Sequence, residues 1–244
     1  MNGNRMGAIS VRILLLIWGF GLAAILSLFF LMDMQSASCD PYPSTERTVQ
    51  PALQFPCPVV GTPLILEHLA AYDGAFFEDG SDREVTGVMA AMLRNPSDRE
   101  LAAACVTLRT GEQTLEFYAQ NILPGAAVLV LEKSAAAYTN DTYDSCWGNV
   151  VEAAQTDLLP HILQIREEGM GTLVITNLSE ELLGPVTLYY KMRPPGQDFY
   201  MGGVTYRTTL EQLLPRQSVR ITPYHYVHNY SCVVKVHIEK GTVA

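Results

Sequence analysis

Two histidines stand three residues apart in this chain, a spacing that invites a test for metal binding. His225 and His228 offer two imidazoles, but no cysteine or carboxylate lies suitably near them in sequence. Positions i and i+3 of a strand point to opposite faces, so the two rings would not converge on one ion. The spacing therefore predicts surface histidines in a loop and no metal site.

Acidic residues crowd a second segment, which contains a glycine turn. Carboxylate oxygens are the ligands that Ca²⁺ prefers, but the spacing matches no known calcium loop, so a solvated hairpin is expected. The acids are Asp73, Glu78, Asp79, Asp82 and Glu84. Cys146 and His161 would supply a nucleophile and a base, but no third orienting group is evident.

The chain carries no nucleophile elbow, phosphate loop, zincin helix or dinucleotide fingerprint. The pattern therefore predicts no enzyme, no metal and no cofactor. The alternative is an envelope hydrolase or a metal-dependent enzyme that uses the loop with His225 and His228, or the acids between Asp73 and Glu84.

Tyrosines concentrate in the segment from Tyr224 to Tyr230, which we predict to be the binding loop. Tyrosine brings a large, rigid and amphipathic surface at low entropic cost, and loops carry recognition in many folds. The predicted binding residues are Tyr224, His225, Tyr226, His228 and Tyr230. The alternative is that these tyrosines pack along strand ends.

Five cysteines occur, and none forms a Cys-x-x-Cys pair or a zinc spacing. The pairs that we would test first as disulfides are Cys39 with Cys57 and Cys105 with Cys146, although neither pairing follows from the sequence. An odd count leaves at least one thiol free or intermolecular. Cys105 and Cys232 are equally well read as small apolar side chains on strands.

The segment Ile13–Met32 contains no charge and is long enough to cross a membrane as a helix. Arg5 and Arg12 precede it and Asp33 follows, so the positive-inside rule leaves residues 1–12 as a cytoplasmic stub. We predict a cell-membrane signal anchor with everything after Asp33 outside the cytoplasm. The alternatives are a cleaved signal peptide and a lipid anchor at Cys39, which also place the body of the protein outside.

The part after the apolar segment is acidic, with 14 basic against 25 acidic residues and a formal charge of −11. Such a surface repels phosphate backbones, so nucleic acid is excluded as a partner. Residues 33–63 are rich in proline, which predicts a semi-extended stalk or a tether.

Four short sequence motifs recur in the same order about 80 to 90 residues later. Asn95-Pro-Ser97 returns as Asn177-Leu-Ser179, and Cys105-Val-Thr-Leu108 as Pro185-Val-Thr-Leu188. Two further matches join Leu123-Pro-Gly125 to Leu214-Pro-Arg216 and Tyr143-Asp-Ser-Cys146 to Tyr230-Ser-Cys232. This repetition indicates a duplicated module, with copies over residues 64–155 and 156–240.

Each copy shows short runs of β-branched and aromatic residues between turn residues, which predicts an all-β fold. The expected strands are Val85–Arg94, Ala102–Arg109, Thr114–Ala119, Ala127–Glu132, Trp147–Ala153, Gly171–Thr176, Val186–Met192, Val204–Glu211, Ser218–Tyr224 and Cys232–Glu239. Pro63–Asp73 and Leu158–Arg166 are expected as opening edge strands, although Leu64–Tyr72 also suits a short helix.

Five to seven short strands in about 80 residues are typical of an immunoglobulin-like β-sandwich. Tyr230-Ser-Cys232 resembles the tyrosine corner of such domains. The turns at Asn95-Pro-Ser-Asp98 and Leu123-Pro-Gly125, with the strand Val106-Thr-Leu108, resemble bacterial immunoglobulin-like domains of the FxLYD type, although the namesake motif is absent.

Together these features predict a single-pass, outward-facing protein of the cell envelope. Its two modules would bind a partner protein or glycan, or act as an accessory subunit. A passive spacer is the remaining alternative.

Overall fold

The computed structural model describes residues 52–154 and 161–239, and within these ranges all regular secondary structure is β-strand. The predicted all-β class is confirmed. The strands are β1 (Cys57–Pro58), β2 (Ile65–Phe76), β3 (Arg83–Arg94), β4 (Leu101–Thr110), β5 (Gln113–Ile122), β6 (Ala127–Leu131), β7 (Ser145–Glu152), β8 (Leu163–Gly169), β9 (Thr172–Asn177), β10 (Val186–Met192), β11 (Phe199–Leu210), β12 (Ser218–Ile221) and β13 (Ser231–Ile238).

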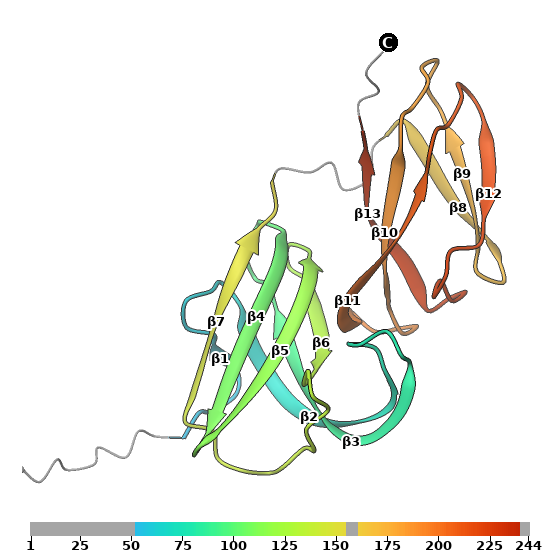
Figure 1. The fold of residues 1–244 in the computed structure, drawn as a ribbon. Coiled ribbons are helices and arrows are strands. Elements are labelled where there is room, and N and C mark those ends of the chain that lie inside the picture. Colours follow the sequence, from blue (N-terminus) through green and yellow to red (C-terminus); the bar gives the residue numbers. More distant parts are fainter. Residues whose placement is uncertain (1–51, 155–160, 240–244) are drawn as a thin grey trace, which may run out of the picture. The chain divides into compact units, whose positions relative to one another are not determined.

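Residues 52–154, which we call module 1, form two facing sheets. One layer has the order β1-β2-β3-β6 and the other has the order β5-β4-β7, with antiparallel pairing throughout (Figure 1). Alternate residues of each strand point inward, for example Val106 and Leu108 of β4 and Phe117 of β5, and they form one buried core with residues of β3 and β6. This is the arrangement of a β-sandwich.

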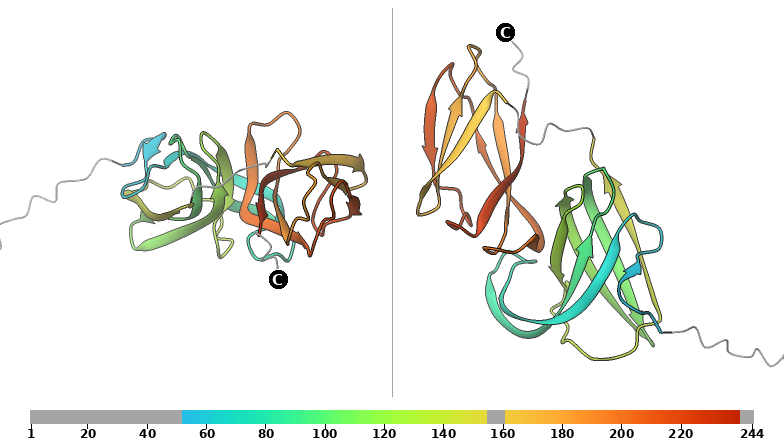
Figure 2. Two further views of the ribbon diagram at one scale, coloured as in Figure 1. Left: turned by 90° about the horizontal axis from the view of Figure 1, so that it is seen from above. Right: turned by 180° about the vertical axis from the view of Figure 1, so that it is seen from behind.

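Residues 161–239, which we call module 2, repeat this arrangement apart from β1. One layer is β8-β9-β12 and the other contains β11-β10-β13, again antiparallel (Figure 2). Leu188 and Tyr190 of β10 pack with Leu173 and Ile175 of β9 in a separate core. The six strands from β2 to β7 therefore correspond in order and in pairing to the six from β8 to β13.

A short parallel pairing joins the sheets of the two modules. Residues 127–129 of β6 pair with residues 199–201 of β11, so that one seven-stranded sheet runs from β1 to β13. The Glu78 carboxylate accepts hydrogen bonds from the backbone N–H of Leu131 (2.9 Å) and of Gly203 (2.9 Å). Both modules consequently belong to one unit, Gln50–Ala244.

Strand β2 resolves an alternative that the sequence left open. Residues 65–76 form β2, so the stretch Leu64–Tyr72 is not a helix. In module 2 the opening strand is β8, and residues 155–160 are not described. No helix long and apolar enough to cross a membrane occurs in residues 52–154 and 161–239. The predicted span Ile13–Met32 and residues 33–51 of the predicted stalk lie outside those ranges. Residues 52–63, also predicted as stalk, belong to module 1, because Cys57 and Val59 are buried in its core.

The repeated Asn-x-Ser motif has the same structural role in both modules. The Asn95 side-chain amide donates to the carbonyl oxygens of Arg99, Ile122 and Leu123 at 2.7 to 3.2 Å. The Asn177 amide donates in the same way to Glu181, Leu213 and Leu214 at 2.8 to 3.2 Å. Both asparagines are fully buried, so each ties three segments of its module together through backbone groups.

The last match of the repeat is out of register. Cys146 of β7 lies opposite Leu108, whereas in module 2 the equivalent Leu188 lies opposite Val236. The counterpart of Cys146 is therefore Val236, and Cys232 opposes Lys191 nearer the strand start. Tyr230, whose motif resembles a tyrosine corner, is 48% exposed.

In module 1 a different tyrosine, Tyr143, hydrogen-bonds to the backbone upstream of it. Tyr143 is buried just before β7, and its hydroxyl donates to the Thr139 carbonyl oxygen, four residues upstream, at 3.0 Å.

Candidate binding site

Three connections between strands meet at one end of module 2. Met192 pairs with Ser231, which places the β10–β11 turn, residues 193–198, beside the start of β13. The hydroxyl oxygens of Thr172 and Thr222 are 3.4 Å apart, which places the β8–β9 turn beside the loop before β13. We call residues 169–171, 193–198 and 222–230 the loop end of module 2.

The close approach of two of these connections explains why position 171 is a glycine. Gly171 has a φ of +73°, and a Cβ at this position would collide with the carbonyl oxygen of Tyr226. Only glycine adopts this conformation without cost and allows the loop to approach so closely. The β8–β9 turn thus supports residues 222–230 from one side.

Large side chains are exposed on the loop end. Tyr224 is 81% exposed and Tyr230 is 48% exposed, as expected of binding residues. Met170 of the β8–β9 turn (94% exposed) and Val227 also face solvent, and neither was singled out from the sequence. Exposed aromatic and methionine side chains at loop tips are typical of interaction surfaces.

Tyr226 does not lie on this surface, which corrects its prediction as a binding residue. It is only 9% exposed, its ring packs edge-on to Tyr190 with centroids 5.5 Å apart, and its hydroxyl donates to the Ser231 carbonyl oxygen at 3.2 Å. Burial raises the pKa of Tyr226 to about 12. The alternative reading of the tyrosines, packing at a strand end, therefore holds for this one.

The two histidines of the loop are held apart by different carboxylates. His225 Nδ1 is 2.9 Å from Asp82 Oδ2, and its ring stacks on Tyr206. His228 Nδ1 is 2.6 Å from Glu167 Oε1. In the described ranges, no group of three or more histidine, cysteine, aspartate and glutamate side chains is arranged to hold a metal ion.

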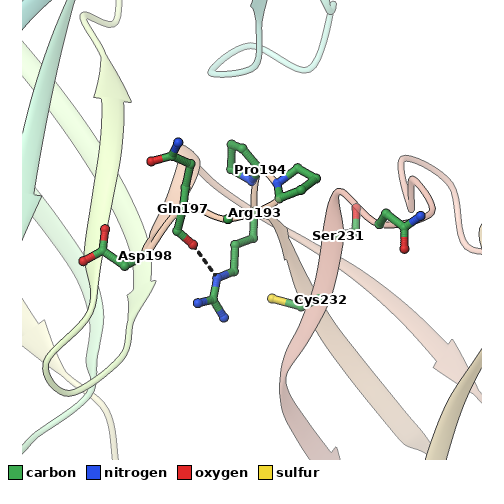
Figure 3. A pocket seen from close by; sticks show the side chains of 9 residues that line it. Arg193, Pro194, Gln197, Asp198, Ser231 and Cys232 are labelled. Atoms are coloured by element: carbon green, nitrogen blue, oxygen red, sulfur yellow. Dashed lines mark hydrogen bonds between the residues drawn. The ribbon is translucent and has the colours of Figure 1, made fainter.

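A pocket of about 450 Å³ opens between the β10–β11 turn and the start of β13 (Figure 3). It is lined by Arg193, Pro194, Pro195, Gly196, Gln197, Asp198, Asn229, Ser231 and Cys232. The backbone N–H of Arg193 donates to the Tyr230 carbonyl oxygen at 2.5 Å, so the pocket borders the exposed tyrosine.

Arg193 is the basic residue of this pocket, which Asp198 also lines. Its Nε donates to the Gln197 carbonyl oxygen at 3.1 Å, and the guanidinium lies over the Tyr200 ring. In the part of the chain that the structure describes, no carboxylate forms a salt bridge with Arg193. The Cys232 thiol borders the pocket, and its pKa is raised by burial although Arg193 opposes the shift. A polar or acidic group of a ligand would find a donor here.

Sequence reasoning missed Arg193 and Cys232 as neighbours of the tyrosines. The signal was available in Arg193-Pro-Pro-Gly196, a turn that lengthens the hairpin of module 2 alone. What the sequence lacks is the β10–β13 register, which brings this turn beside Asn229 and Ser231.

The acids between Asp73 and Glu84 do not form a common site. Asp73 accepts from the Gly87 N–H (2.7 Å), Asp79 from the Ser81 N–H (2.9 Å), and Glu78 from Leu131 and Gly203. Most of these carboxylates already have separate partners.

The cysteine pair Cys105 and Cys146 is not brought together. Cys146 shares the inward face with Leu108, whereas Cys105 points to the other face of the same sheet. All four cysteines in the described ranges, Cys57, Cys105, Cys146 and Cys232, are free thiols in this structure. Cys39 lies in the part of the chain that is not described.

Burial raises the pKa of Cys146 to about 12, so its thiol is a poor nucleophile.

Comparison of the sequence with protein-family models finds no match. A search of curated proteins likewise finds no similar sequence. The description of the site therefore depends on the chain's own residues.

Proposed function

We propose that this protein is a single-pass membrane protein whose two β-sandwich modules face away from the cytoplasm and bind a partner protein through the loop end of module 2. The modules are immunoglobulin-like in this proposal, and residues 13–32 are the anchor. The observation that carries it is the convergence of Tyr224, Tyr230 and Met170, all exposed, beside the pocket of Arg193.

The chemistry of this surface favours a protein over a glycan. Met170 and Val227 are apolar, and methionine and aromatic side chains are enriched in the cores of protein interfaces. Arg193 offers a planar, charged donor beside Tyr230, and tyrosine and arginine are the residue types that dominate binding energy at interfaces. A glycan or a purely passive spacer remains as an alternative outcome of the experiment.

A photo-crosslinking amino acid at position 224, in cells that express the full chain, tests the proposal. We expect a discrete crosslinked protein, and we expect that Tyr230→Ser combined with Arg193→Ala reduces its yield at least tenfold. A crosslinker at Leu182, which is also exposed but lies in the β9–β10 connection at the other end of module 2, is the matched control. If position 224 captures nothing beyond what position 182 captures, the chain does not bind through this loop end.

Protease added to intact cells tests the topology separately. Residues 52–239 should be digested from outside while a cytoplasmic marker protein survives. Protection of the C-terminal part would show that the predicted orientation is wrong.

A further inference from the structure

Two buried cysteines from distant parts of the chain share the core of module 1. Cys57 belongs to β1 and Cys146 to β7, and both are members of the main core of this module. Each thiol affects the pKa of the other: Cys57 contributes to the raised pKa of Cys146, and Cys146 opposes the rise in the pKa of Cys57. The pair joins segments that are about 90 residues apart in sequence.

Backbone hydrogen bonds hold these two segments in a fixed relation. The N–H of Val60 donates to the carbonyl oxygen of Cys146 at 3.2 Å, and the N–H of Gly148 donates to the carbonyl oxygen of Val60 at 2.9 Å. Val60 and Trp147 form a parallel bridge. Cys57 and Cys146 therefore share one core because the chain beside them is paired.

We infer that Cys57 and Cys146 form a structural disulfide that fastens the N-terminal edge of module 1 to β7. Bond formation removes one proton and one electron from each thiol. The two electrons pass by thiol–disulfide exchange to an incoming disulfide, such as oxidised glutathione or the catalytic disulfide of an oxidase, which leaves as two thiols. The pair differs from both pairs that the sequence suggested.

The position of the pair determines when the bond would form. Burial makes Cys146 a poor nucleophile in the folded module, because exchange requires the thiolate. Oxidation therefore belongs to the folding chain, before the core closes, and the same burial protects the finished bond from reductants. The geometry is independent of the proposed binding role, but oxidation in cells rests on the proposed placement outside the cytoplasm.

Tryptic mapping of the full chain under non-reducing conditions tests the bond. Each cysteine falls on its own tryptic peptide: residues 13–47 for Cys39, 48–83 for Cys57, 100–109 for Cys105, 134–166 for Cys146 and 221–235 for Cys232. Cells are lysed with a thiol-blocking reagent. We expect peptide 48–83 linked to peptide 134–166, two mass units lighter than the sum of the reduced peptides.

Refolding of the purified full chain in a glutathione redox buffer separates the possible failures. If the link forms on refolding but not in cells, the disulfide is confirmed and the proposed outward placement is wrong. If peptide 48–83 is free or linked to peptide 13–47 in both samples, the inference is wrong.

Serine variants give an independent readout. Cys57→Ser and Cys146→Ser should each lower the melting temperature of the oxidised protein by on the order of 10 °C, because closure of a long loop is lost. After reduction, the wild type should have the same melting temperature as the two variants. Cys105→Ser, on the outer face of the same sheet, is the control and should leave the melting temperature of the oxidised protein nearly unchanged.

Discussion

At the scale of single residues, the most informative side chains are buried and polar. Asn95 and Asn177 each satisfy three backbone carbonyl oxygens and, through Oδ1, accept from the following serine. Buried polar groups are tolerated only when they are paired. The asparagines are therefore repeated because each closes the end of its sandwich, and their repetition carries no information about a ligand.

Replacement of either asparagine should be strongly destabilising. Asn95→Ala and Asn177→Ala each remove three buried or partly buried hydrogen bonds to backbone carbonyl oxygens, and we expect a loss of about 3 kcal/mol in the free energy of unfolding. Urea denaturation would measure it. Asn149→Ala, at an exposed position of β7, is the control and should change stability by less than about 0.5 kcal/mol. If Asn95→Ala did not change the free energy of unfolding, the amide would not be needed there.

We expect Lys191 to make the stability of the protein depend on pH. Its Nζ is buried and donates to the carbonyl oxygens of Gly203 (3.3 Å) and Val204 (3.1 Å). Burial lowers the pKa of Lys191 to about 7, against the attraction of Glu78. In the unfolded chain the pKa of lysine is about 10.4, so between these values the unfolded state binds more protons and stability rises with pH.

We therefore expect the free energy of unfolding to increase between pH 7 and about pH 10 relative to a Lys191→Met variant. The variant keeps the volume of the side chain and removes the titrating group, so contributions from other residues cancel in the difference. Urea denaturation at several pH values would provide it. A difference that stays flat over this range would show that Lys191 remains protonated in the folded state.

At the scale of elements, the hairpin turns decide what the loop end of module 2 presents. The β8–β9 turn supports the loop of residues 222–230, and the β10–β11 turn forms one wall of the pocket with Arg193. These turns connect strands whose pairing builds the two layers of the sandwich. The surface is thus a product of strand register, and a change in one turn should propagate to the tyrosines.

Gly171→Ala tests this dependence. The new methyl group would press on the Tyr226 carbonyl oxygen in addition to the strain of a positive φ. Gly196→Ala is the matched control, because its φ is +76° but no atom lies within 4 Å of the added Cβ. We expect a cost of about 1 kcal/mol for the control and at least double for Gly171→Ala.

Hydrogen exchange at the Tyr226 N–H, which donates to Pro223, would report the displaced loop. Exchange should be faster in Gly171→Ala and unchanged in Gly196→Ala. Equal behaviour of the two variants would mean that the turn does not support the loop.

At the scale of the whole described chain, the two modules share one sheet through β6 and β11. Glu78 completes this link, because its carboxylate accepts hydrogen bonds from the N–H of Leu131 in β6 and the N–H of Gly203 in β11. Burial raises the pKa of Glu78, although the two N–H groups and Lys191 oppose the shift. The link predicts that the modules unfold together.

Glu78→Ala should separate their unfolding. The variant leaves the N–H groups of Leu131 and Gly203 without the carboxylate, and we expect one calorimetric transition in the wild type to become two. Glu84→Ala, at an exposed position of β3, is the control and should keep a single transition. Two transitions in the wild type would show that the link does not couple the modules.

The sequence by itself determined the all-β class and the positions of most strands, because alternation and turn residues act over a few positions. Val186–Met192 was predicted residue for residue, and the strand around Arg94 within two. The Asn-x-Ser repeat and the β10–β11 turn at Pro194 were likewise readable, since each is local turn chemistry.

Only the tertiary structure decided which side chains meet. Tyr226 is buried while Tyr224 is exposed, and Cys146 shares a core with Cys57 and not with Cys105. These outcomes depend on strand register and on pairing between segments far apart in sequence, where a shift of one residue moves a side chain to the opposite face. No spacing within a single segment contains that information.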